Sequence, residues 1–187
     1  MQCAQILCSI MFRYKAEFDY LGSMNAATII EQLGMMPHPE GGFYKETYRA
    51  TSMVQPADGR TERNTSTAIY YLLADEDKSH FHRVASDELW FFHQGATIEI
   101  YIIQHDGTLS VKLLGNNLLK GETPQVTVAA NQWFAAKIQG DKGFALVSCT
   151  VAPGFAFEDF ELADREILQK QYPALSKEIL QLSMEKS

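Results

Sequence analysis

The chain has few cysteines, no paired basic residues and no long apolar run, and each absence excludes a class of protein. Its three cysteines, Cys3, Cys8 and Cys149, are odd in number and widely spaced, which argues against a disulfide framework and favours a reducing compartment. No two Lys or Arg residues are adjacent, and the formal net charge is −7 with a pI near 5.2. We therefore expect neither a nucleic-acid partner nor a membrane partner.

The first 23 residues differ from the rest of the chain in their sequence pattern. Their apolar stretch, residues 3–12, is too short to span a bilayer and lacks the preceding positive charge of a secretory signal. Arg13 and Lys15 precede the first acid, Glu17, so a mitochondrial presequence is the alternative to a cytoplasmic protein. We expect residues 1–23 to be a leader or a disordered extension and residues 24–187 to form one domain, as the length suggests.

The remainder indicates an all-β fold with short helices at both ends. Asn25 and Gly34 are suitable caps for a helix over residues 26–33, and a helical tail stops at Pro173 and restarts with Ser176 as its cap. Between them, runs rich in β-branched and aromatic residues alternate with turn residues roughly every ten positions. The predicted strands are 43–50, 66–73, 79–84, 87–93, 97–103, 109–114, 125–128, 132–137 and 143–152. Many short strands at this spacing predict a sandwich or barrel, here a jelly roll.

The stretch SHFHRVASDELWFFHQG, residues 79–95, contains the main candidates for chemistry. His80 and His82 would point to one face of a strand, and Glu88 on the next strand would lie close to them. Two imidazoles and a carboxylate suit zinc, iron, manganese or nickel. Equally, the histidines can be polar groups at the mouth of a sheet that are hydrogen-bonded to Glu88. His93 has the opposite parity to Glu88, so a regular strand places it on the other face.

Four segments together resemble one known family. They are HPEGGFYKETYRA at 38–50, the histidine stretch, QWFAAKI at 132–138 and VAPGFAFEDFEL at 151–162, and they resemble the Cupin_5 family (DUF985). The resemblance implies an RmlC-like double-stranded β-helix, the cupin jelly roll, and a homodimer. In the second cupin motif, Phe134 stands where other cupins have a metal-binding histidine.

Three hypotheses for function arise from these residues. The first is an epimerase or isomerase with His82 as the base and Glu88 as its orienting carboxylate, acting on a small molecule such as a sugar or nucleotide sugar. The second is a non-catalytic protein that binds a small ligand in the same pocket. The third is a metal-dependent enzyme that uses His80, His82 and Glu88. The remaining candidate ligand-binding residues are His80, Trp90, Tyr101, Trp133, Phe134, Glu40 and Tyr44.

Several residues have two readings. Arg83 is either an anion ligand or a residue on the opposite face from His82, and Asp159 is either a pocket acid or a solvated surface residue. Glu40 and Arg49 belong either to a lid or edge strand beside the pocket mouth, or to the surface as ion-pair partners or dimer contacts. Cys149, in an apolar run, is expected to be a buried hydrophobe rather than a nucleophile.

Overall fold

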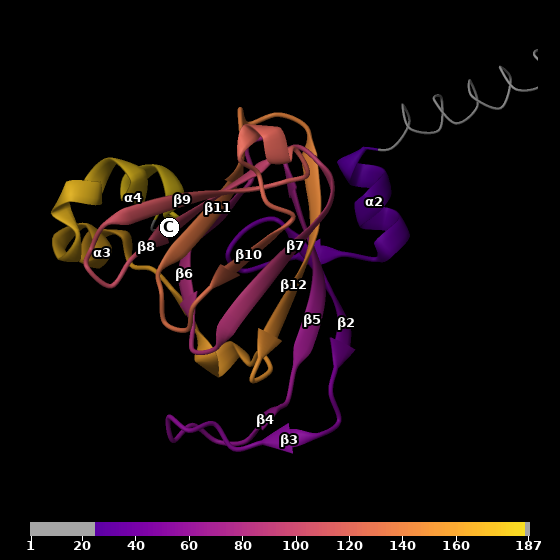
Figure 1. Ribbon diagram of the computed structural model, residues 1–187, viewed down its shortest axis with the longest axis vertical. Helices are drawn as coiled ribbons and strands as arrows, with labels where there is room; N and C mark the ends of the chain where they lie inside the picture. Colours follow the sequence, from indigo (N-terminus) through magenta and orange to yellow (C-terminus); the bar gives the residue numbers. More distant parts are fainter. Residues whose placement is uncertain (1–24, 186–187) are drawn as a thin grey trace, which may run out of the picture.

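The computed structural model describes residues 25–185, so the expected leader or extension over residues 1–23 lies outside the described residues. Two antiparallel sheets pack face to face, and their strands follow the jelly-roll arrangement that the sequence predicts (Figure 1). Short helices accompany both ends of the strand series. Within residues 25–185 no helix combines the length and the apolar character that crossing a bilayer requires.

The first sheet has six strands in the order β1-β2-β5-β12-β7-β10. Their bounds are β1 Met36–Pro37, β2 Phe43–Arg49, β5 Thr67–Ala74, β12 Phe144–Ala152, β7 Asp87–Gly95 and β10 Gln125–Val128. β12 is central and pairs with both β5 and β7 over most of its length. Its inward residues alternate with half-buried ones, as a strand with one face on the core requires.

The second sheet has five strands in the order β13-β6-β11-β8-β9. Their bounds are β13 Phe160–Leu162, β6 Lys78–Val84, β11 Phe134–Ile138, β8 Ile98–Ile103 and β9 Leu109–Leu114. A separate two-stranded ribbon, β3 Met53–Val54 with β4 Arg63–Asn64, extends from the end of the first sheet (Figure 1). We call residues 51–66, which contain this ribbon, the arm.

The helix boundaries lie where the sequence predicts, except for the start of the last helix. α2, Ala26–Leu33, is capped by the Asn25 side chain, which accepts from the Thr28 amide at 3.0 Å, and Gly34 closes it at φ 60°. The tail forms α3 Arg165–Gln171, the 3-10 turn η3 Pro173–Leu175 and α4 Ser176–Leu182. The predicted cap Ser176 is wrong, because this residue is already inside α4 and its Oγ accepts from Gln169 Nε2 at 2.8 Å.

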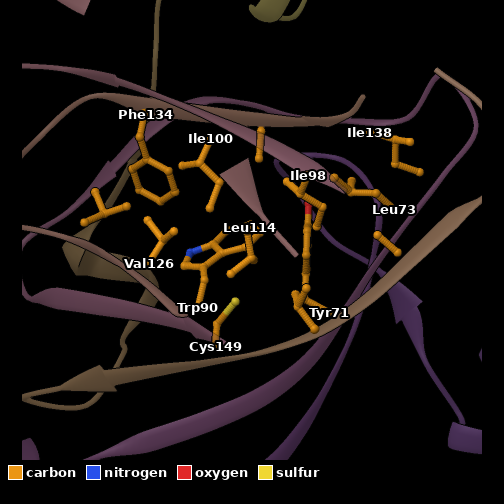
Figure 2. Packing of buried hydrophobic residues seen from close by; sticks show 14 of the residues in the cluster. Tyr71, Leu73, Trp90, Ile98, Ile100, Leu114, Val126, Phe134, Ile138 and Cys149 are labelled. Atoms are coloured by element: carbon orange, nitrogen blue, oxygen red, sulfur yellow. The ribbon is translucent and has the colours of Figure 1, made fainter. Parts of the chain in front are cut away.

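The main core lies between the two sheets. Trp90, Tyr71 and Phe134 are fully buried there, with the Trp90 and Tyr71 ring centroids 5.4 Å apart (Figure 2). Aliphatic residues such as Ile98 and Leu114 fill the space around them (Figure 2). A second cluster, under α3 and α4, covers the outer face of the five-stranded sheet, and a third joins α2 to β5.

Every predicted strand of four or more residues is present, with ends that differ by two residues at most. The strands that were not predicted are β1, β3, β4 and β13, each of two or three residues. Such short segments carry too few residues for a period-two pattern, and pairing with a neighbour decides them instead.

Candidate functional site

A cavity of about 150 Å³ opens between β2, β5, β6, β7 and β12. Its deep part is lined by Glu40, Tyr71, His82 and Glu88, all of which are buried. Its mouth is formed by more exposed side chains, including Glu46, Arg49 and Phe157. Several ionisable groups therefore face one enclosed space, which an ordinary apolar core does not contain.

The turn before β2 places Glu40 in this cavity, and a pair of glycines makes that placement possible. Gly41 has φ 110°, and a Cβ at this position would lie 2.1 Å from the Lys78 carbonyl oxygen. The close approach lets the His80 amide donate to the Glu40 carbonyl at 2.9 Å. Tyr71 fixes the same turn by donating its hydroxyl to the Gly41 carbonyl at 2.7 Å. Gly42, the next residue, also has positive φ, 66°.

The Glu40 carboxylate is the centre of a buried polar cluster. Ser79 donates its hydroxyl to Glu40 Oε1 at 2.8 Å, while His82 Nε2 lies 3.2 Å from Oε2 and His38 Nδ1 lies 3.3 Å from the same oxygen. The carboxylate partner of His82 is therefore Glu40 rather than Glu88. These contacts also assign Glu40 to the pocket, one of the two readings that the sequence left open.

Both ring nitrogens of His82 face acceptors. Nδ1 lies 2.7 Å from the His80 carbonyl oxygen, which only accepts, so Nδ1 carries the proton of the neutral ring and Nε2 faces Glu40. Burial lowers the pKa of His82 below its ordinary value of 6.5, and the Glu40 charge and the His80 carbonyl offset this effect only in part. Burial also raises the pKa of Glu40, but His82, His38 and Ser79 together outweigh it and lower the value to about 2. Glu40 is thus ionised at neutral pH.

Glu88 on β7 has the opposite behaviour. Burial, and secondarily the Glu40 charge, raise its pKa to about 8, against the smaller opposing effects of the Cys149 thiol and the Trp90 indole. Glu88 has no basic side chain as a hydrogen-bond or ion-pair partner among residues 25–185. Its carboxyl group is mostly protonated at pH 7 and presents a hydrogen-bond donor to the cavity.

The predicted convergence of His80 with His82 and Glu88 is wrong for His80. The register between β6 and β11 shifts, so that Phe134 pairs with His82 but Ala136 pairs with Ser79. This bulge places one extra residue on β6 and reverses the parity of the side chains before it. Ser79 consequently reaches Glu40, whereas His80 is only partly buried, does not line the cavity and bonds the Glu40 carbonyl through Nδ1 at 2.7 Å.

Four predicted ligand-contacting aromatic residues do not line the cavity either. Trp90 and Phe134 belong to the main core (Figure 2), where Phe134 packs against the His82 ring with centroids 4.1 Å apart. Trp133 and Tyr101 belong to the cluster under α3 and α4, and Tyr101 donates its hydroxyl to Glu99. These residues position the site from behind rather than forming its walls. Of the predicted ligand-contacting set, Glu40 and Tyr44 do line the cavity.

The structure shows where the residues with two interpretations lie. Arg83 pairs with Glu161 and lies 4.5 Å over the Trp133 ring, away from the cavity. Asp159 is neither a pocket acid nor solvated, because it is buried in an ion pair with Arg63. His93 is exposed on the outer face, as its parity predicts.

Cys149 faces the cavity as a buried free thiol whose pKa is raised well above its usual range by burial, which agrees with a small buried hydrophobe. Arg49 lies at the mouth, where it donates to Glu46 from Nε and Nη2. It therefore belongs to the pocket rim, although its side chain remains 39% exposed.

Sequence reasoning missed His38 and Tyr71 as cavity residues, together with a wall of aromatic residues. Phe155 and Phe157 line the cavity as well. The His–Pro–Glu–Gly–Gly run gave a signal for His38, since its proline and glycines indicate a loop and binding residues are often located on loops. No local signal identified Tyr71, which is one aromatic residue in a strand of similar residues.

The metal hypothesis finds limited support in this geometry. Two of its three ligands, His82 and Glu88, line the cavity, but His80 does not. Across residues 25–185, no three or more His, Cys, Asp and Glu side chains are arranged to hold a metal ion. Phe134, at the position of the fourth cupin ligand, adds an apolar ring beside His82.

Comparisons with known proteins agree with this fold. A family model described as "Cupin superfamily (DUF985)" matches residues 27–163. An uncharacterised protein of Saccharomyces cerevisiae is 32% identical over 145 residues, which cover 70% of this chain and 71% of the yeast protein.

Solved structures give the same result. A hypothetical protein from Leishmania major superposes with a TM-score of 0.83 at 33% identity, covering 87% of this chain and all of that one. A protein from Shewanella oneidensis has a TM-score of 0.80 at 39% identity and covers 87% of this chain and 99% of its own. Oxalate decarboxylase from Bacillus subtilis, at 13% identity and a TM-score of 0.50 over 80% of this chain and 37% of its own, is similar in fold alone.

Proposed function

The chain belongs to the DUF985 family of the cupin superfamily, and from its cavity we propose that it binds a small oxygen-bearing molecule inside the barrel. The observation that carries the proposal is that two buried carboxyl groups, Glu40 and Glu88, line the same cavity, in surroundings that lower the pKa of the first and raise that of the second. Keeping such groups in a core without a ligand costs stability, so their presence favours a binding role.

The lining gives the ligand its expected chemistry. Protonated Glu88 donates a hydrogen bond, which suits a carbonyl, hydroxyl or ether oxygen on the ligand. Apolar side chains, including Ile69, Val84 and Val151, surround this donor and favour a compact carbon skeleton. The volume of about 150 Å³ matches a molecule or moiety of roughly benzene size, which is smaller than a whole nucleotide sugar.

Native mass spectrometry of gently purified protein tests the binding proposal. We expect a small bound molecule on the parent protein and its loss from Val151→Phe, which fills the cavity. The control Val111→Phe makes the same change at an exposed position on β9, and it should retain the adduct. A parent protein that carries no adduct after purification from its source, in repeated preparations, would oppose the proposal.

A second candidate function is proton transfer on the bound molecule, as in an isomerase or epimerase. The observation that favours it is the raised pKa of Glu88, about 8, because a group that titrates near neutral pH both donates and accepts protons efficiently. In this arrangement Glu88 exchanges the proton, and the His82–Glu40 pair supplies a fixed charge distribution across the cavity. The alternative, with His82 as base, requires Nε2 to leave Glu40, since both ring nitrogens are engaged.

Hydrogen exchange in deuterated buffer tests proton transfer without knowledge of the natural substrate. Three- and four-carbon hydroxyketones fit the cavity, and NMR detects loss of their α-hydrogens. Exchange that is abolished by Glu88→Gln but retained in His82→Gln assigns the proton transfer to Glu88, and the reverse result assigns it to His82. No enzyme-dependent exchange with any of these compounds counts against the catalytic proposal and leaves the binding proposal to its own test.

We also propose that the protein is a homodimer, which rests on the family resemblance alone. The chain mass is 21.1 kDa, so size-exclusion chromatography with light scattering should give about twice that mass. A mass equal to one chain at micromolar concentration would contradict the proposal.

A further inference from the structure

A buried ion cluster connects the arm to the rim of the cavity. Arg63 on the arm donates from Nε to Asp159 Oδ2 at 2.7 Å and from Nη2 to Oδ1 at 2.9 Å, a two-pronged contact. Arg60 adds a bond from Nη1 to Asp159 Oδ2 at 2.8 Å. The side chains of Arg63 and Asp159 are 8% and 4% exposed, so solvent screens this cluster weakly.

Asp159 ends the short turn η2, Phe157–Asp159, which forms part of the cavity wall. Phe157 on this turn is 55% exposed and also faces the cavity, so it stands at the mouth. Its ring lies 5.1 Å from Phe155 and stacks 6.3 Å from His38. Phe160, the first residue of β13, lies 5.3 Å from the His82 ring. The aromatic wall, which we define as Phe155, Phe157 and Phe160, therefore covers the Glu40 cluster.

Further bonds tie the arm to the start of this wall. The Gly154 amide donates to the Asn64 carbonyl at 2.7 Å, and a Cβ at Gly154 would lie 2.9 Å from that oxygen. Arg49 bridges the two segments, since its Nη1 donates to Asn64 Oδ1 at 3.0 Å and to the Phe155 carbonyl at 3.1 Å. The wall is thus held at both of its ends by residues of the arm or its base.

Most residues of the arm are exposed, and Pro56 is buried. The ribbon extends away from the two sheets (Figure 1), and Met53 in it is 50% exposed. Arg60 also donates to Ser86 at 3.2 Å, between β6 and β7. A mostly exposed element that is tied to the body by hydrogen bonds and ion pairs of this kind is able to shift without breaking the core.

We infer that the arm acts as a clamp on the aromatic wall, and that the contacts of Arg60 and Arg63 with Asp159 control access to the cavity. The regulatory role of the clamp rests on the proposed function, because the clamp controls access to that site. The opening itself does not depend on a ligand: breaking the ion cluster frees η2, moves Phe157 and opens the mouth. Arg60 and Arg63 are positioning residues, because they act on the cavity only through Asp159 and the wall.

Cys149 provides a built-in reporter of opening. Its thiol lines the cavity and is 2% exposed, so a reagent reaches it only through the mouth or after unfolding. Methyl methanethiosulfonate is small enough for the cavity. The Cys149 thiolate attacks its sulfenyl sulfur, a disulfide forms, methanesulfinate leaves and the thiol proton passes to solvent. A Cys3→Ser, Cys8→Ser background leaves Cys149 as the single reactive thiol.

The test measures the labelling rate of Cys149 by mass spectrometry in this background. We expect Arg63→Ala and Asp159→Asn to raise the rate by about tenfold or more, since local opening replaces rare global opening. Arg83→Ala is the matched control, because it removes another arginine–carboxylate pair, with Glu161, away from the mouth. Its rate should stay within about twofold of the background protein.

Global destabilisation is separated from opening by a second control. Ile179→Ala weakens the distant cluster under α3 and α4 without touching the wall. If the clamp variants label faster than Ile179→Ala at equal stability to urea, the clamp is supported. If labelling rates follow global stability alone, or if the clamp variants match Arg83→Ala, the clamp is overturned. In that event a bound molecule in native mass spectrometry would still support the proposed function, so the two can fail separately.

Discussion

Glu40 and His82 come from segments 42 positions apart and meet through Oε2 and Nε2 at 3.2 Å, inside the barrel. The contact exists because a glycine pair lets one turn press against β6. It engages Nε2 of His82, which is therefore not a free base in the cavity. Glu88 is left as the carboxyl group of the cavity that titrates close to neutral pH.

Glu40→Gln should destabilise the protein at pH 7 by about 3 kcal/mol, because it leaves a buried imidazole without its charged partner. The pKa of Glu40 is lowered to about 2, so its contribution is present above the ordinary value of 4.5 and is lost as pH falls through 2. Urea unfolding should therefore show the deficit of Glu40→Gln shrinking in acid. Glu46→Gln is the control: its pair with Arg49 is about 40% exposed, and we expect a cost below about 1 kcal/mol. Equal effects of the two substitutions would refute the buried pair.

Glu88→Gln should have the opposite effect. The pKa of Glu88 is raised to about 8, so the folded state is favoured below the ordinary value of 4.5 and loses this advantage as pH rises through 8. The variant should therefore gain stability relative to the parent between pH 5 and 9, by a few kcal/mol at most. Chemical unfolding at several pH values measures the difference. A stability difference that does not change with pH would mean that Glu88 ionises normally.

Gly41→Ala should displace the turn that carries Glu40, because the new Cβ would lie 2.1 Å from the Lys78 carbonyl oxygen. We expect a loss of stability of more than about 2 kcal/mol and, in acid, the loss of the pH dependence that Glu40 causes. Gly59→Ala is the matched control, since Gly59 also has positive φ, 85°, but has nothing within 4 Å of a new Cβ. If both variants lose the same stability, backbone strain alone explains the effect and the close approach is unimportant.

Elemental analysis tests the metal hypothesis. Since His80 does not line the cavity, we expect less than about one tenth of an equivalent of zinc, iron, manganese or nickel after mild purification. Adding zinc should leave the melting temperature unchanged. Stoichiometric metal in the parent that disappears in His82→Gln would show instead that a cupin metal site forms despite Phe134 and the bulge in β6.

Much of the fold could be predicted from the sequence, because composition and recurrent turn residues identify the long strands. β12 and β8, for example, were found within a residue or two. The resemblance of four segments then gave the jelly roll. The short strands β3 and β4 could not be predicted, since two residues carry no alternation and their pairing depends on the rest of the arm.

The site could be predicted only in part. His82 and Glu88 were identified, but a single bulge in β6 removed His80, and no local pattern reveals where a bulge falls. Glu40 was named without its role, because its partner lies 42 positions away. Aromatic residues that were assigned to the pocket, such as Trp133, pack in a hydrophobic cluster instead. Buried packing is the more common role of large aromatic side chains, and the sequence alone does not distinguish it from ligand contact.

The proposed function depends on a cavity that holds one carboxyl group protonated and one ionised at neutral pH. Carbon-13 NMR of protein labelled at the glutamate carboxyl carbons measures this directly across a pH titration. We expect one resonance that titrates near pH 8 and is missing in Glu88→Gln, and one that stays ionised down to about pH 2 and is missing in Glu40→Gln. Titration of every glutamate near the ordinary value of 4.5 would show that the cavity does not separate the two groups.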